Sequence, residues 1–183
     1  MSVILGLDIS TSCIGWCVLN AESGSLVNAG SIVLKDIKCM FEKAQKTKEA
    51  LGELIKEHNV KHIAIEENLQ AFRPGFSSAK TIVTLARFNG ITSWLSYECI
   101  KIKPGFINVN HARKAVGLKI DRKSDLSTKE QVFEWAKKNG MESFPWPTKT
   151  LKSGPRKGRV IFDDSCYDIY DAFVIAKAHV NNE

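Results

Sequence analysis

Four acidic residues stand where the chain can bring carboxylates together. Asp8 ends the apolar run VILGLD, and Glu66 ends the apolar run HIAIE. Asp168 and Asp171 lie three positions apart in YDIYDAFVIAKAH, residues 167 to 179. Residues three apart are neighbours on one face of a helix, so these two carboxylates border its apolar stripe and repel each other.

A divalent cation would remove this repulsion. Burial and like charges both disfavour ionised carboxylates, so four of them at one point need a positive charge between them. Mg²⁺ and Mn²⁺ suit an all-carboxylate site without Cys or His ligands. Two such ions about 4 Å apart activate a water on one side of a phosphodiester and stabilise the leaving oxygen on the other. The set therefore indicates metal-dependent phosphodiester hydrolysis, although each acid alone is equally well explained as a turn cap, a strand end or a solvated helix flank.

Length and composition predict one soluble globular domain. The 183 residues, 44% apolar and 25% charged, suffice for one core and are too few for two. Without a membrane-spanning run or a targeting pattern, we expect a cytoplasmic protein that is not secreted and has no membrane partner. Five cysteines without a CxxC pair predict reduced thiols and no zinc site.

The positive charge is concentrated in two stretches. The net charge is +6 with a pI near 9.1, which indicates an anionic partner. We expect a basic loop at 145–160, which contains no acid between positions 149 and 159, and a looser cluster at 113–123. A solvated flexible loop is the alternative. The candidate DNA-binding bases are Lys80, Arg113, Lys114, Lys152, Arg156, Lys157 and Arg159.

The first part of the chain alternates strands and helices. Apolar runs at 3–8, 14–19 and 26–34 predict an antiparallel meander, with turn residues between the second and third runs. Asp36 can cap a helix running to about residue 58, and a strand follows at 62–66. A loop then leads to a helix that Ser77 or Ser78 can cap and that ends near Tyr97.

The second part contributes one strand and two helices. A fifth strand is expected at 103–110, and STKE from Ser127 is a capping box for a helix that ends at Gly140. Asp164 or Ser165 can cap the final helix. This order predicts an α/β fold with a five-stranded mixed sheet and helices on both faces. If the strand from 62 lies beside the strand from 3, Asp8 and Glu66 are close together.

Four segments carry a family resemblance. GLDISTSCIGWCVL, AIEEN, ARFNGITSWL and DIYDAFVIAKAH resemble the motifs of the RuvC family of Holliday junction resolvases, within the RNase H-like superfamily, from residue 3 to about 180. The resemblance implies an RNase H-like fold and a homodimer that makes paired nicks in four-way DNA junctions. It also implies two Mg²⁺ ions, replaceable by Mn²⁺, no nucleotide cofactor, and a location in a bacterial cell or phage-infected host.

The resemblance assigns roles to the acids. Asp8 would bridge both metals, Glu66 and Asp171 would bind them, and Asp168 would complete the site or position the water. Glu67 directly follows the motif glutamate, but side chains alternate along a strand and only one of the pair can point at Asp8. Asp164 is a further candidate, although a capping role is the simpler interpretation.

Two departures from the family pattern concern DNA recognition. Relatives place an aromatic residue three positions after the motif glutamate, where this chain has Leu69. Phe72 beside Arg73 is a candidate for stacking on an unpaired base, and a core phenylalanine is the alternative. The basic stretch at 145–160 is longer than in the cellular enzymes and indicates a divergent member of phage or viral type.

Three other functions share parts of these signals. A ribonuclease H acting on RNA-DNA hybrids, or a broader flap and branched-DNA nuclease, would use the same metal chemistry. The STS after Asp8 also resembles the phosphate loop of sugar kinases and actin, but Ser10 stands at the glycine position and the chain is too short for that two-lobed fold. A non-enzymatic DNA-binding module would need the bases but not the four acids.

Overall fold

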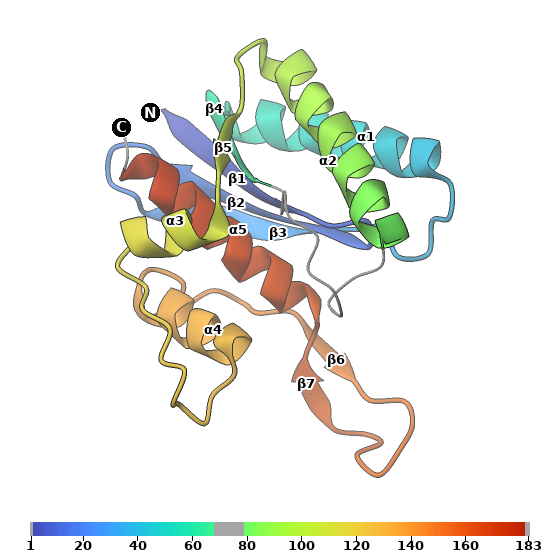
Figure 1. The fold of residues 1–183 in the computed structure, drawn as a ribbon, viewed down its shortest axis with the longest axis vertical. Helices are drawn as coiled ribbons and strands as arrows, with labels where there is room; N and C mark the ends of the chain where they lie inside the picture. Colours follow the sequence, from blue (N-terminus) through green and yellow to red (C-terminus); the bar gives the residue numbers. More distant parts are fainter. Residues whose placement is uncertain (1, 68–78, 182–183) are drawn as a thin grey trace.

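A five-stranded mixed sheet forms the centre of the molecule. The computed structural model describes residues 2–67 and 79–181. The sheet has the order β3-β2-β1-β4-β5, and Figure 1 shows it at the middle of the fold. Its strands are β1 (Val3–Ile9), β2 (Cys13–Asn20), β3 (Leu26–Val33), β4 (His62–Glu66) and β5 (Gly105–Ile107). The first three form the predicted antiparallel meander, and β4 and β5 are added in parallel, so the predicted sheet is confirmed.

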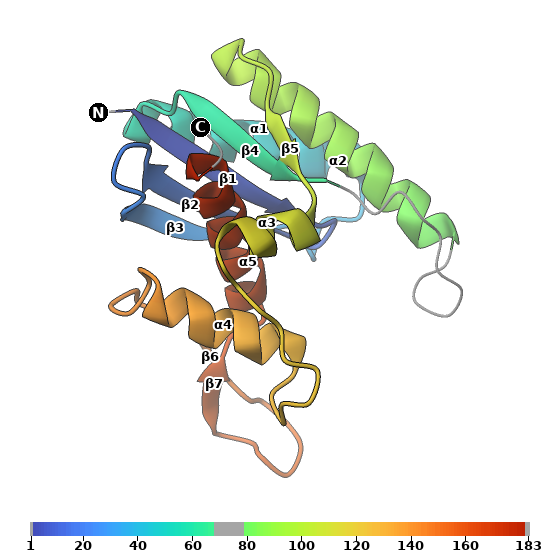
Figure 2. The same ribbon diagram turned by 60° about the vertical axis from the view of Figure 1, so that its left-hand side comes forward.

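Helices cover both faces of this sheet, as predicted. On one face lie α1 (Met40–His58) and α2 (Ala79–Ile100). The other face is crossed by α5 (Ser165–Val180), against which α3 (Val109–Ala115) and α4 (Thr128–Lys138) pack. Figure 2 shows α5 running across the strands between these two small helices and the sheet.

The alternation of side chains along β1 divides the core into two layers. Leu5 and Leu7 are buried in the layer that α1 and α2 close with Leu51 and Phe88. Successive side chains of a strand point to opposite faces, so Gly6 and Asp8 face α5. The layer on this side is built around α5, most of whose side chains are buried.

The capping box before α4 is confirmed, and the start of α1 differs from prediction. The Ser127 hydroxyl accepts a hydrogen bond from the Glu130 amide, and the Glu130 carboxylate accepts one from the Ser127 amide. By contrast, α1 begins after Cys39 without a side-chain cap, so the Asp36 cap is wrong. The predicted Ser77 or Ser78 cap lies outside the described residues.

The region after β4 contains more structure than the sequence indicated. The strand expected at 103–110 covers only Gly105–Ile107, because the Asn108 side chain accepts a hydrogen bond from the Asn110 amide and starts α3 there. A polar cap of this kind satisfies a helix amide that a strand would leave unpaired. The sequence analysis did not predict α3.

The basic stretch at 145–160 is a hairpin rather than a loop. Its strands are β6 (Thr148–Thr150) and β7 (Val160–Phe162), which pair antiparallel in a separate two-stranded sheet. Strands of three residues are too short to show an alternating pattern, which explains why the prediction was wrong. Among the described residues, no helix combines the length and apolar character needed to cross a lipid bilayer.

Candidate active site

Asp8 and Glu66 lie side by side because β1 and β4 pair in parallel. The register places Leu7 opposite Ile65, so the acids occupy the next positions on the two strands. Both residues are partly exposed. Their side chains are hydrogen-bonded to each other. This confirms that the strand from 62 lies beside the strand from 3, and it places Glu66 rather than Glu67 at Asp8.

Two glycines let α5 approach these acids. Gly15 is the partner of Asp8 across the β1-β2 pair. A Cβ atom at Gly15 would overlap the backbone of Asp168, and one at Gly6 would overlap the carbonyl oxygen of Ala172. The backbone of α5 therefore rests directly on β1 and β2. This close packing brings Asp168 and Asp171 toward the carboxyl-terminal end of β1, where Asp8 lies.

The acids influence one another's protonation. Burial, followed by the charges of Glu66 and Asp171, raises the pKa of Asp8 well above its usual value. Burial and the Glu66 charge raise the pKa of Asp171 to about 7. Burial also raises the pKa of Asp168. Like charges in a poorly solvated place hold protons that isolated carboxyl groups would release.

The residues present fit a divalent cation. All the donors are carboxylate oxygens, and Oδ1 of Asp171 is buried without a hydrogen-bond partner. A cation would supply the missing partner and offset the repulsion that raises the pKa values. In this conformation, no three His, Cys, Asp or Glu side chains within 2–67 and 79–181 are grouped closely enough to enclose an ion.

Two cationic side chains stand beside the acids. Nη2 of Arg113 lies 3.9 Å from Oδ1 of Asp171, whereas the sequence analysis had assigned Arg113 only to DNA binding. Nζ of Lys129 lies 4.5 Å from the centre of the Tyr167 ring. The Lys129 charge acts to lower the pKa of both Asp168 and Asp171. The sequence analysis missed Lys129, because its place in the capping box gave no sign of its neighbours.

Cys13 also contacts the site. Its side chain is hydrogen-bonded to Asp168, and burial raises the pKa of the Cys13 thiol to about 12. The thiol therefore keeps its proton and donates a hydrogen bond to the Asp168 carboxylate. The sequence analysis treated Cys13 only as a buried thiol. Its position two residues before Gly15, on the same face of β2, is the signal that links it to α5.

The predicted DNA-binding residues fall in three places. Lys80 lines a hollow of about 380 Å³ with Ser10 and Thr11, the residues after β1. Arg113 and Lys114 line a second hollow of about 250 Å³. The other four described bases, Lys152, Arg156, Lys157 and Arg159, are exposed on the hairpin.

Of the alternative site residues, the structure describes Glu67 and Asp164. The amide of Glu67 donates to the carbonyl oxygen of Ile107 in β5. Asp164 forms an ion pair with Lys149. It precedes α5 without capping it, because the Ser165 amide donates to Oδ1 of Asp163 instead. Leu69, Phe72, Arg73 and Phe76 lie outside the described residues.

Comparison with known proteins shows the fold. No protein-family model matches the chain, and no curated protein matches its sequence. Thermus thermophilus RuvC is similar in structure, with a TM-score of 0.62, 16% identity, and coverage of 98% of this chain and 93% of that one. The same protein in complex with Holliday junction substrate has a TM-score of 0.63 and 16% identity, with coverage of 99% of this chain and 94% of that one. The yeast mitochondrial Holliday junction resolvase has a TM-score of 0.58 and 15% identity, with coverage of 97% of this chain and 77% of that one. The chain thus has the RNase H-like fold of the RuvC-type Holliday junction resolvases.

Proposed function

We propose that this protein is a metal-dependent endonuclease that resolves four-way DNA junctions by paired phosphodiester hydrolysis. The observation that carries the proposal is that Asp8 from β1, Glu66 from β4, and Asp168 and Asp171 from α5 lie near enough for their charges to raise the pKa values of Asp8 and Asp171. The fold is shared with a RuvC whose structure contains a Holliday junction substrate. Carboxylates near a phosphate groove oppose DNA binding unless a metal neutralises them, so a binding module without catalysis is the weaker explanation.

In this proposal the four acids hold two Mg²⁺ ions, with Mn²⁺ as a substitute. Such ions activate water and stabilise the leaving oxygen of the cleaved phosphodiester. Asp8, Glu66 and Asp171 would hold the ions, and Asp168, to which the Cys13 thiol is hydrogen-bonded, would complete the set of ligands.

The cations around the acids orient the DNA backbone. Arg113 reaches Asp171 on one side and lines the basic hollow with Lys114 on the other. A phosphate next to the cleaved one fits this hollow, because guanidinium and ammonium groups both bind phosphate oxygens. Lys80 occupies the corresponding position at the opposite side of the acids, beside the turn after β1.

Paired nicks require two active sites, and α2 offers a surface for a second copy of the chain. Its outward face carries Val83, Gly90, Trp94 and Tyr97, at helical spacing and all exposed. The rings of Trp94 and Tyr97 lie 5.5 Å apart, centre to centre. We propose that residues 1–183 form a single nuclease domain that works in the cytoplasm as a homodimer joined through α2.

A substrate panel tests the proposal. The purified protein is incubated with labelled four-way, three-way, flap and linear DNAs and with an RNA-DNA hybrid, with and without Mg²⁺. We expect symmetric nicks in the four-way junction that require the metal. Cleavage confined to the hybrid, or strongest on flaps, would replace the proposal by a ribonuclease H or a broader branched-DNA nuclease.

The variant Asp8→Asn separates catalysis from binding. It keeps the size of the side chain but removes the charge that the ions need, so we expect at least a hundredfold loss of cleavage with junction affinity retained. Lys48→Gln, on the far side of the molecule, serves as a control with full cleavage. Persistent cleavage by Asp8→Asn would refute the assigned site.

A further inference from the structure

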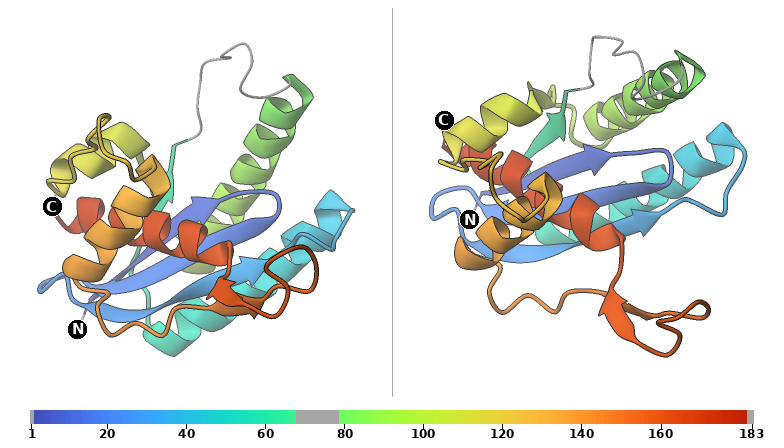
Figure 3. Two further views of the ribbon diagram at one scale, coloured as in Figure 1. Left: turned by 90° about the horizontal axis from the view of Figure 1, so that it is seen from below. Right: turned by 60° about the horizontal axis from the view of Figure 1, so that its bottom comes forward.

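The hairpin at residues 148–162, here called the basic arm, projects from the body of the protein. Figures 1 and 3 show it extending from the beginning of α5, away from the central sheet. Its strands are short, and most of its residues between the strands are exposed. A surface element of this kind contributes little to the core, so its composition reflects another use.

Backbone hydrogen bonds give the arm a defined conformation. Beyond the paired strands, the Leu151 amide donates to the Arg159 carbonyl at 2.9 Å, and the Gly158 amide returns to the Leu151 carbonyl at 2.8 Å. Gly154 and Gly158 adopt φ values of 77° and 86°, which favour glycine. These hydrogen bonds and glycine conformations define a turn at the tip of the arm.

The tip of the arm is uniformly positive. Lys152, Arg156, Lys157 and Arg159 are exposed, and none of them forms an ion pair within the part of the chain that the structure describes. No acid interrupts the sequence between Lys149 and Arg159. Four unpaired cationic side chains on a projecting hairpin are suited to bind a polyanion with regularly spaced charges.

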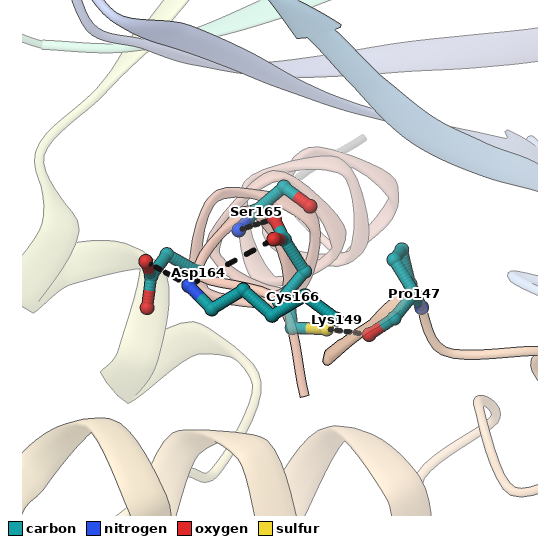
Figure 4. A network of polar contacts seen from close by, with 6 residues as sticks. Pro147, Lys149, Asp164, Ser165 and Cys166 are labelled. Carbon is teal, nitrogen blue, oxygen red and sulfur yellow. Dashed lines mark hydrogen bonds and ion pairs between the residues drawn. The ribbon is translucent and has the colours of Figure 1, made fainter. Parts of the chain in front are cut away.

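The base of the arm is joined to the start of α5. Lys149 forms ion pairs with Asp164 and, at 3.8 Å, with Asp163 (Figure 4). The Asp163 amide donates to the Pro147 carbonyl at 2.9 Å, and the Cys166 thiol donates to the same oxygen at 3.3 Å. These contacts hold both strands of the arm against the first turn of the helix.

An aromatic contact fixes the base from the other side. The ring of Phe162 in β7 lies 5.1 Å from the ring of Phe133 in α4, at an edge-to-face angle of 66°. Asp168 follows Phe162 by only six residues. The base of the arm is therefore attached both to α4 and to the beginning of α5, the helix that carries Asp168 and Asp171.

We propose that the basic arm binds the phosphate backbone of a duplex leaving the cleavage site, and that its attachment to α5 sets the distance between this contact and the cut. The proposal rests on the proposed nuclease function. Seven steps from Thr148 to Pro155, at about 3.3 Å each, give a reach of about 23 Å at most. At 3.4 Å per base pair, this corresponds to about seven base pairs.

Charge removal tests the contact. The variant Lys152→Gln, Arg156→Gln, Lys157→Gln, Arg159→Gln is compared with Lys48→Gln, Lys56→Gln, Lys61→Gln, Lys103→Gln, which removes the same charge from exposed sites away from the acids. Affinity for a four-way junction is measured without Mg²⁺ over a range of salt concentrations. We expect the slope of log affinity against log salt to fall by about 3 for the arm variant, and by less than about 1 for the control. Equal slopes for the two variants would overturn the proposal.

Hydroxyl-radical footprinting tests the distance. We expect the arm variant to lose protection up to about seven base pairs from the cut on one side, while the control keeps it. Protection unchanged in the arm variant would overturn the ruler role. If the wild-type protein cuts no branched DNA, yet the arm variant alone loses its salt dependence on linear duplex, the arm contact stands and the proposed function fails. Normal junction cleavage with equal salt slopes would mean that the proposed function stands and the arm contact fails.

Discussion

At the scale of single residues, the fold puts the carboxyl groups of the site where their ionised forms are unfavourable. Asp8 and Asp171 are ordinary acids that the fold deprives of water and puts beside other carboxylates, so their pKa values rise. Arg113 offsets only part of this at 3.9 Å from Asp171. The metal-free protein therefore holds a cluster that is stable mainly in its protonated form.

This conflict predicts how stability depends on pH. The pKa of Asp171 is about 7 in the folded protein and close to 4 in an unfolded chain. Between these values the folded state binds more protons, so the free energy of unfolding of metal-free protein should fall as pH rises through this window. Thermal unfolding in the presence of a chelator measures the effect.

Two comparisons make this prediction specific to the acids. Mg²⁺ should flatten the decline because it replaces the protons, and Asp171→Asn should flatten it without metal. A metal-free midpoint for Asp171→Asn that follows the wild-type pH profile across the whole window would contradict the prediction.

At the scale of elements, the sequence predicted what depends on local pattern and failed where pairing or contact decides. The apolar runs in VILGLD and HIAIE located two strands, and the acids at their ends were therefore found. Their parallel register, which makes Asp8 and Glu66 neighbours, is a long-range property that no local pattern encodes. Lys129 and Cys13 were missed for the same reason, since only the packing of α4 and α5 brings them to Asp168.

The contact between Gly15 and the α5 backbone leads to a prediction about packing. Gly15→Ala puts a Cβ into the Asp168 backbone, so α5 must shift. Overpacking of this kind costs about 1–3 kcal/mol, and the shift should also abolish cleavage. Denaturant unfolding and the junction assay measure both effects.

The control for this variant is Gly52→Ala, in the middle of α1. A Cβ there meets no atom within 4 Å. Alanine should stabilise the exposed helix by about 0.5–1 kcal/mol and leave cleavage intact. Wild-type stability together with full activity in Gly15→Ala would show that the close approach of α5 is not required.

At the scale of the whole molecule, the outward stripe of α2 is the surface on which the proposed dimer depends. The side chains of Val83 and Trp94 in this stripe are 48% and 60% exposed. Sequence pattern did not reveal this stripe, because the same helix also buries Phe88, Thr92 and Ser96 on its inner face. Only the position of α2 against the sheet separates its two faces.

The dimer proposal leads to a prediction with a matched control. Trp94→Glu puts a charge into the stripe and should convert the protein to a monomer, measured by light scattering after gel filtration. Phe41→Glu changes an aromatic residue that is 83% exposed on α1 and should leave the oligomeric state unchanged. The monomeric variant should also nick four-way junctions without pairing the nicks. A dimer of unchanged stability in Trp94→Glu would exclude this surface.

The place of α5 in chain order has a consequence for protein synthesis. It follows every other element that the structure describes. It also covers one face of the sheet and carries two of the four acids. A nascent polypeptide that has left the ribosome only as far as α4 has one bare sheet face and an incomplete set of carboxylates. Folding of that layer and assembly of the site thus become a single late event, and a translation product that ends before α5 lacks two of the four acids.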